Sequence, residues 1–205
     1  MKVLFVPAKK IFGKIDFSGL DSIEEENISL CYSIQFEELA KEVKKRIHNK
    51  IIDEIQVLGC SAPSFSEKTK AILIIGEGEF HPVALAYESG LRVYVFNENG
   101  LREIKENQIE DIKKRERGAY LKYLSSKRAG ILVSTKPGQQ RLSRALNFKK
   151  NTKDKKIYIF IANEINVNEF ENFGLESWIN SACPRMDLEN KILLNINNLN
   201  SRNRK

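Results

Sequence analysis

Short, uninterrupted runs of Ile, Val and Leu are the feature that most constrains the fold of this chain. AILIIG (71–76) and GILVS (130–134) are apolar at nearly every position, unlike the alternating strands of a half-exposed sheet. Strands of this kind are buried on both faces, because helices cover a parallel sheet above and below. The sequence therefore predicts an α/β fold with mostly parallel sheets flanked by helices.

The same alternation of strands and helices extends over both halves of the chain. We expect further strands at 3–7, 28–34, 54–59, 92–96, 156–162 and 177–182. Helical spacing of apolar residues predicts helices at 36–47, 81–89, 108–128 and 137–150. A boundary within the long charged helix divides the chain into two similar three-layer units, 1–115 and 116–205, each of ordinary domain size. We expect a cleft between them at the C-terminal ends of the strands, where open α/β sheets bind ligands.

Charge and hydropathy narrow the class of protein. The formal net charge of +7 arises from 34 basic and 27 acidic residues, which favours acidic partners such as nucleic acid or an acidic protein. Lys/Arg runs such as Lys149–Lys150 are most simply solvated, so we expect RNA binding to be weak at most. No run approaches the roughly 20 apolar residues of a membrane helix, and MKVLFVPAKK is too short for a signal peptide. These features predict a cytoplasmic protein that does not bind membranes.

Three cysteines in a reducing compartment argue against a disulfide framework. Cys31 lies inside an apolar strand and is predicted to be a packed core residue. Cys60 and Cys183 each follow the C-terminal end of a strand, where a packed thiol, a nucleophile and a metal ligand all remain possible. Neither belongs to a CxxC pair, which argues against a zinc ribbon or finger.

Four loops with small or polar residues follow predicted strands: LGCSAP (58–63), GEGEFHP (76–82), STKPGQ (134–139) and SACPRMD (181–187). The backbone amides of the glycine-rich loop could hold an anion, although it matches neither a dinucleotide fingerprint nor a P-loop. Lys136, together with the expected start of a helix, could bind a negative group.

Taken together, these segments resemble the diphthamide synthase family, the 2-(3-amino-3-carboxypropyl)histidine synthases. The resemblance runs almost end to end, and the combination of STKPGQ with ACPR is its most specific part. The matching segments are SIQFEELAKEVKKRI (33–47), QVLGC (56–60), GEGEFHPVALAYESG (76–90), ILVSTKPGQQRLSRAL (131–146) and NEINVNEFENFGLESWINSACPRMDLE (163–189).

The resemblance implies an iron–sulfur enzyme. In that family three homologous α/β domains each give one cysteine to a 4Fe–4S cluster, and S-adenosylmethionine binds the open iron. Reductive cleavage releases a 3-amino-3-carboxypropyl radical, which modifies a histidine of translation elongation factor 2. Such chemistry also needs an electron donor.

By the same resemblance, Cys60 and Cys183 match the cluster ligands of the family's middle and last domains. Arg185 could supply positive charge near the cluster or pair with Asp187. The resemblance places nine further residues at the cofactor cleft, where they could hold the methionine carboxylate and amine of S-adenosylmethionine: Gln35, Gly76, Gly78, His81, Ser134, Thr135, Lys136, Gly138 and Gln139.

The family's first domain has no counterpart in this sequence. We therefore expect that another chain, or a related synthase subunit, supplies the third ligand of an aminocarboxypropyl transferase. The alternative is a non-catalytic subunit or regulator that keeps the fold and binds the synthase or the elongation factor. Retention of both strand-end cysteines favours the enzyme, since a binding role needs no cluster thiols.

Overall fold

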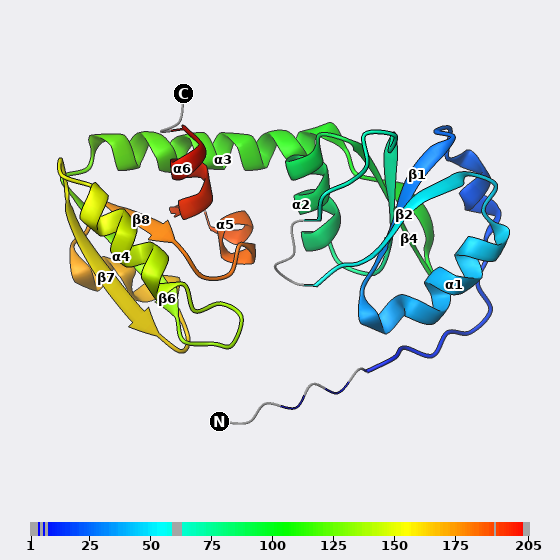
Figure 1. The fold of residues 1–205 in the computed structure, drawn as a ribbon, viewed down its shortest axis with the longest axis horizontal. Coiled ribbons are helices and arrows are strands. Elements are labelled where there is room, and N and C mark those ends of the chain that lie inside the picture. Colours follow the sequence, from blue (N-terminus) through cyan, green and yellow to red (C-terminus); the bar gives the residue numbers. More distant parts are fainter. Residues whose placement is uncertain (1–3, 5, 7, 59–62, 191, 203–205) are drawn as a thin grey trace. The chain divides into compact units, whose positions relative to one another are not determined.

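The computed structural model describes residues 4, 6, 8–58, 63–190 and 192–202. The chain consists of two compact units, unit 1 (Met1–Ile109) and unit 2 (Glu110–Lys205). The boundary falls within α3 (Glu106–Ser125), the long green helix of Figure 1. The strand expected at 3–7 lies largely outside the described residues.

Unit 1 contains a five-stranded sheet in the order β2-β1-β3-β4-β5. Its first four strands are mutually parallel, and β5 is antiparallel to β4. The strands are β1 (Asn27–Tyr32), β2 (Lys50–Gln56), β3 (Ala71–Ile75), β4 (Arg92–Asn97) and β5 (Gly100–Glu103). All five residues of β3 are buried, as its continuous apolar run predicts. β5 was not expected, because four residues with one apolar side chain carry little periodicity.

Helices pack on this sheet through their apolar residues. The helix α1 (Glu37–Arg46) follows the short 3-10 turn η2 (Ile34–Phe36) and buries Leu39, Ala40 and Val43 in the core. Acidic residues in its first turn and basic residues in its last turn complement the helix dipole. The helix α2 (Phe80–Ser89) packs on β4, and η1 (Ser18–Ser22) adds Leu20 to the core.

Unit 2 contains a four-stranded, wholly parallel sheet in the order β7-β6-β8-β9. Its strands are β6 (Arg128–Ser134), β7 (Lys156–Ala162), β8 (Ser177–Asn180) and β9 (Leu193–Asn195). The remaining elements are α4 (Leu142–Asn151), η3 (Val167–Phe173), α5 (Arg185–Glu189) and α6 (Ile196–Arg202). The structure thus confirms the predicted α/β class, with two mostly parallel sheets flanked by helices.

Two apolar clusters form the core of unit 2. One includes Tyr123, Phe148 and Leu199, which come from α3, α4 and α6. The other is built around Trp178, whose ring stacks on Phe170 with a centroid distance of 4.1 Å. The Trp178 ring also lies over Gly130 so closely that an added Cβ would be 2.5 Å from Cζ3. Close packing of the indole therefore requires a glycine at this position of β6.

No helix within the described ranges is both long and apolar enough to cross a membrane.

Candidate cofactor site

The predicted site residues of unit 1 lie at the carboxyl edge of its parallel sheet. Gln35 lies in η2, directly after β1, and the loop that contains Gly76 and Gly78 follows the neighbouring strand β3. Cys60 follows β2 in the sequence but lies outside the described residues. Gln35 and the glycine loop thus follow two adjacent strands at the same edge of the sheet, as expected for parallel strands.

Hydrogen bonds within unit 1 already use part of this loop. The Gly76 amide donates to Phe96 O at 3.2 Å, and Gly76 O accepts from Asn97 Nδ2 at 3.2 Å. Gly78 has φ +78°, and its carbonyl accepts from Arg102 Nη2 at 3.4 Å. These two glycines therefore shape the loop. The Gly76 amide already donates a hydrogen bond within unit 1, so it is not available to bind an anion.

His81 is the second residue of α2, and Pro82 occupies the first turn as predicted. The imidazole packs edge-on against Phe80 with a centroid distance of 5.0 Å, and its Nε2 is buried. His81 thus lies at the start of the helix that follows the 76–79 loop.

In unit 2, the loop after β6 forms a tight turn. The Gln139 amide donates to Lys136 O at 3.0 Å, with Pro137 and Gly138 at the two central positions. Gly138 has φ +78°, the left-handed conformation of the second central residue in a type II turn. The helix expected from residue 137 begins only at Leu142. Lys136 therefore does not lie at a helix N-terminus, and that expectation is wrong because Pro-Gly favours a turn.

The rest of this loop is anchored to β6 and to the segment after β7. Ser134 is buried, and its Oγ accepts from the Lys136 amide at 3.1 Å. Thr135 N donates to Ala162 O at 3.0 Å. The Lys136 ammonium lies 3.6 Å from Glu164, and both side chains are exposed. A ligand carboxylate would compete with Glu164 for this cation.

Cys183 lies just beyond β8, the strand adjacent to β6. It is a free, half-buried thiol. Ser181 bonds to the Leu132 carbonyl through its amide at 3.1 Å and its hydroxyl at 2.6 Å. The Cys183 loop is therefore tied directly to β6, whose end carries the Ser134–Gln139 loop.

Asn180 fixes the loop that presents Cys183. Its Nδ2 donates to Cys183 O at 2.8 Å and to Asp187 Oδ1 at 2.7 Å, while its Oδ1 accepts from the Ala182 amide at 2.8 Å. Asp187 Oδ2 accepts from Asn195 Nδ2 at 2.5 Å. Burial raises the pKa of Asp187 to about 7, although hydrogen bonds from both asparagines oppose this shift.

Asn180 and Asn195 were not singled out from the sequence. Each is an asparagine at the C-terminal end of a short strand, SWIN or LLN, directly after apolar residues. This position is the signal that could have identified them. Pairing of Asp187 with Arg185 was one expectation. In the structure, the Asp187 carboxylate accepts hydrogen bonds from the side-chain amides of Asn180 and Asn195.

Cys31 is a structural residue, as predicted. It is fully buried in β1, and burial raises the pKa of its thiol to about 12. Such a thiol stays protonated at neutral pH, whereas a metal ligand must be a thiolate. Cys31 therefore does not fit a cluster site.

An iron–sulfur cluster is held by several thiolates that converge on one position. Within the described part of the chain, no group of three or more His, Cys, Asp or Glu side chains could hold a metal. Cys183 does fit a single thiolate ligand, because it is reduced, partly accessible and held by a hydrogen-bonded loop. Among the described residues, Cys183 thus fits one thiolate ligand of such a cluster.

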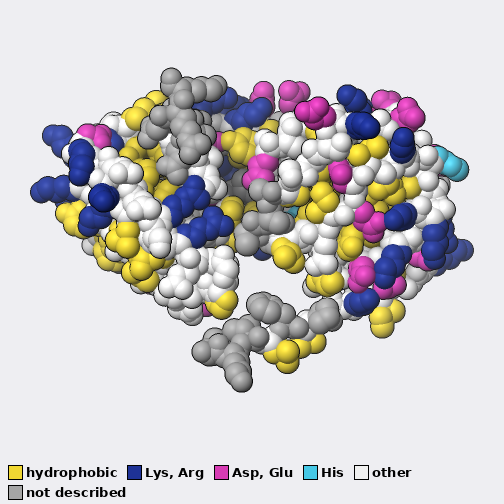
Figure 2. Space-filling view, in the orientation of Figure 1, with side chains coloured by type: hydrophobic (Ala, Val, Ile, Leu, Met, Phe, Trp, Pro, Cys, Tyr) yellow, Lys and Arg dark blue, Asp and Glu magenta, His cyan; other side chains and the backbone are white. Residues whose placement is uncertain are grey.

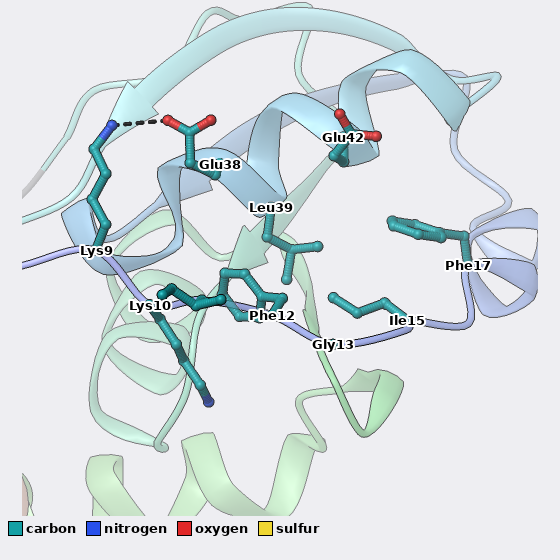
Figure 3. A pocket seen from close by; sticks show the side chains of 10 residues that line it. Lys9, Lys10, Phe12, Gly13, Ile15, Phe17, Glu38, Leu39 and Glu42 are labelled. Carbon is teal, nitrogen blue, oxygen red and sulfur yellow. Dashed lines mark hydrogen bonds and ion pairs between the residues drawn. The ribbon is translucent and has the colours of Figure 1, made fainter.

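A separate pocket of about 570 Å³ lies between residues 9–17 and α1. Figure 3 shows Phe12, Ile15 and Leu39 within it, and the bond from Lys9 to Glu38 (2.8 Å) at its margin. None of the predicted cofactor-binding residues lines this pocket. It therefore gives no support to the predicted site.

Comparison with known proteins identifies the family. The model of the diphthamide synthesis protein family matches residues 1–192. The 2-(3-amino-3-carboxypropyl)histidine synthase of Pyrococcus horikoshii is 31% identical over 136 residues, which cover 65% of this chain and 40% of that protein. The synthase of Methanocaldococcus jannaschii is 26% identical over 216 residues, covering 94% of this chain and 58% of that protein. The chain thus spans about half the length of these relatives.

Solved structures share the fold. The crystal structure of Dph2 from Pyrococcus horikoshii superposes with a TM-score of 0.73 at 23% identity, covering 90% of this chain and 61% of that chain. The crystal structure of the same protein with a 4Fe-4S cluster gives a TM-score of 0.70 at 25% identity, covering 83% and 55%.

Proposed function

The chain belongs to the diphthamide synthesis protein family, and from this premise we propose that it acts in the first step of diphthamide biosynthesis. In this proposal it is part of an aminocarboxypropyl transferase that modifies a histidine of translation elongation factor 2 with S-adenosylmethionine. In this proposal a partner chain or a related synthase subunit supplies further ligands of the cluster. The names of the similar synthases and the 4Fe-4S cluster of the similar crystal structure support this proposal.

The observation that carries the proposal is the arrangement at the end of β8. Cys183 is partly accessible, and Asn180 fixes the backbone on either side of it through Ala182 N and Cys183 O. A cluster ligand needs this combination of accessibility and fixed position, because thiolates must converge on preset metal positions. A thiol that merely filled the core would be enclosed, as Cys31 is.

Cys183 and Cys60 would hold the cluster as thiolates. When bound, such a cluster supplies a single electron for reductive cleavage of the sulfonium of S-adenosylmethionine. The exposed ammonium of Lys136 could attract the methionine carboxylate, and the turn formed by Pro137 and Gly138 would shape the wall beside it. Gln35, His81 and Gln139 are further candidates for polar contacts with the cofactor.

A second candidate function, a non-catalytic subunit that binds the synthase or the elongation factor, has one observation in its favour. Within the described residues, Cys183 is the one thiol that fits a cluster ligand, and no group of three metal-binding side chains is found there. The two functions make different demands on Cys183, since a binding role does not require its sulfur.

Anaerobic reconstitution with iron and sulfide tests the proposal. Wild-type chain, Cys60→Ser, Cys183→Ser and the control Cys31→Ala would be reconstituted alone and with cell extract that supplies partner chains. Bound iron and sulfide, the electron paramagnetic resonance spectrum of the reduced sample, and modification of elongation factor 2 by mass spectrometry are the readouts.

We expect Cys60→Ser and Cys183→Ser to lose cluster signal and product, and Cys31→Ala to retain both. Equal cluster content in wild type and Cys183→Ser would exclude Cys183 as a ligand. If the wild-type chain gives neither a cluster signal nor modified elongation factor 2, even with extract, the non-catalytic function is favoured.

A further inference from the structure

The two units differ sharply in charge. Unit 2 carries 20 of the 34 Lys and Arg residues but only 10 of the 27 Asp and Glu residues. In unit 1, more than half of the basic side chains make ion pairs with carboxylates: Lys9, Lys10, Lys41, Lys44, Lys45, Arg46, Arg92 and Arg102. The positive charge of unit 1 is therefore balanced locally, and the excess belongs to unit 2.

Part of this excess gathers at the amino edge of the unit 2 sheet. We call Lys127, Lys149, Lys150, Lys153 and Lys156 the amino-edge lysines; all are exposed. Lys127 directly precedes β6, and Lys156 is the first residue of β7. Lys149 and Lys150 lie in the last turn of α4, and Lys153 lies in the α4–β7 loop. Lys156 N donates to Lys127 O at 2.9 Å, which places the two strand starts side by side. Figure 2 shows basic side chains gathered over this end of unit 2.

Nearby carboxylates do not neutralise the amino-edge lysines. Asp154 lies 3.4 Å from the Lys155 ammonium, which is nearly enclosed and also donates to Leu124 O and Ser126 O at 2.9 Å each. Glu176 pairs with Arg128 at 3.6 Å and accepts from the Lys127 amide. Among the described residues, no ion pair involves the ammonium of an amino-edge lysine.

Helix stabilisation accounts for only part of this cluster. Lys149 and Lys150 lie in the last turn of α4, where positive charge interacts favourably with the helix dipole. Lys153 and Lys156 lie beyond the helix, so this effect does not explain them. Accumulating like charges without carboxylates costs electrostatic energy, and a polyanionic ligand would relieve that cost.

The composition of the surface favours nucleic acid over an acidic protein. Protein interfaces are depleted in lysine and depend on buried aromatic or arginine anchors. Phosphate backbones, in contrast, are bound by exposed lysine ammonium groups through charge, with release of counterions. Lysines spread over two strand starts and a helix end suit a chain of phosphates better than one compact anion.

We propose that the amino-edge lysines form a surface that binds nucleic acid through its phosphate backbone, without reading its sequence. This surface lies at the edge of the sheet opposite to the Cys183 loop, because β6, β7 and β8 are parallel and Cys183 follows the carboxyl end of β8. Nucleic acid at this edge would therefore leave the Cys183 loop of unit 2 open. The inference does not depend on the proposed enzymatic function.

Fluorescence anisotropy of a labelled single-stranded oligouridine tests this surface on the full chain. In the test variant Lys149, Lys150, Lys153 and Lys156 are all replaced by Gln. A matched control replaces the ion-paired Lys9, Lys41, Lys44 and Lys45 of unit 1 by Gln, which gives the same net charge. Affinity is measured over a range of salt concentrations, with polyglutamate as a competitor, and circular dichroism checks that each variant is folded.

We expect wild type to bind weakly and with a strong salt dependence, and the test variant to bind at least 10-fold more weakly at low salt. Loss of four phosphate contacts would reduce the slope of log affinity against log salt by about 3. The control should stay within about 2-fold of wild type. Equal losses in both variants would show that only net charge matters and overturn the proposal. Polyglutamate that competes as well as RNA would reassign the surface to an acidic protein.

Discussion

The side-chain nitrogen of Asn180 lies 2.7 Å from Asp187 Oδ1 and 2.8 Å from the carbonyl oxygen of Cys183. One amide group thus joins the half-buried carboxyl group of Asp187 to the backbone of the candidate ligand. The backbone position of Cys183 consequently depends on the side chains of Asn180 and Asp187.

Replacing Asn180 by Asp should destabilise unit 2. The substitution removes the donor to Cys183 O and sets a second carboxylate against Asp187. Leaving buried polar groups unpaired and opposing two charges costs on the order of 3 kcal/mol. The loss should be smaller at pH 5, where the two carboxyls can share a proton. Urea denaturation at pH 5 and pH 8 measures this, with the exposed Asn147→Asp as a control that changes stability little.

The pH dependence of stability should report Asp187 itself. Its pKa is raised to about 7 in the folded chain, above the ordinary 3.8, so between these values the folded state holds a proton that the unfolded state has released. Stability therefore falls as pH rises through this window. Relative to Asp187→Asn, wild type should lose about 2 kcal/mol between pH 5 and pH 7. A constant difference between the two proteins across this range would contradict the raised pKa.

The two described cysteines should differ in reactivity. Cys183 is partly accessible, whereas Cys31 is enclosed in β1 with a pKa raised to about 12. Iodoacetamide at pH 8 should label Cys183 in the folded chain and leave Cys31 unmodified, because alkylation requires an accessible thiolate. Peptide mass spectrometry would locate the label, and both thiols should react in urea. Labelling of Cys31 at the rate of Cys183 in folded protein would contradict the assigned burial.

Gly130→Ala should destabilise the core of unit 2. The new methyl group would lie 2.5 Å from Trp178 Cζ3 and 2.9 Å from Leu175 Cδ1, so the ring must shift. Overpacking of this kind costs about 1–3 kcal/mol. The control is Gly118→Ala in α3, where no atom lies within 4 Å of the new methyl group and helix propensity should add roughly 0.5–1 kcal/mol. Thermal denaturation should therefore shift in opposite directions for the two variants.

Gly138→Ala should strain the turn after β6. An L-residue at φ +78° costs about 1–2 kcal/mol. Gly13→Ala, in a loop with no positive φ and no atom within 4 Å, should be nearly neutral. If the turn forms part of the cofactor site, Gly138→Ala should also weaken S-adenosylmethionine binding in isothermal titration calorimetry. Unchanged binding alongside the expected loss of stability would remove this turn from the proposed site.

Sequence patterns predicted most of the sheet framework, because fully buried parallel strands leave a strong signal. The buried runs of β3 and β6 are continuous in Ile, Leu and Val, and both strands lie in the interior of their sheets. The strands β5 and β9 escaped prediction, since four and three residues do not establish a period. The helix predicted at 137–150 begins only at Leu142 in the structure. The prediction extended the helical spacing of apolar residues through Pro137 and Gly138, which form a turn instead.

The support of Cys183 could not be predicted in this way. Asn180, Asp187 and Asn195 come from β8, α5 and the end of β9, and only the packing of these elements brings their polar groups together. Propensity and periodicity describe neighbours along one element, whereas these hydrogen bonds join different elements. Sequence resemblance pointed to Cys183 but gave no account of what holds it.

Every residue of the segment from Asn180 to Cys183 is fixed by a hydrogen bond. Asn180 is bound to Asp187, Ser181 to Leu132, Ala182 to the side chain of Asn180, and the carbonyl of Cys183 to the same side chain. One inserted residue would move the sulfur by up to about 3.5 Å and would break this series of contacts. The number of residues between strand and thiol should therefore be as restrictive as their identity, and length variation in this protein should be tolerated elsewhere in the chain.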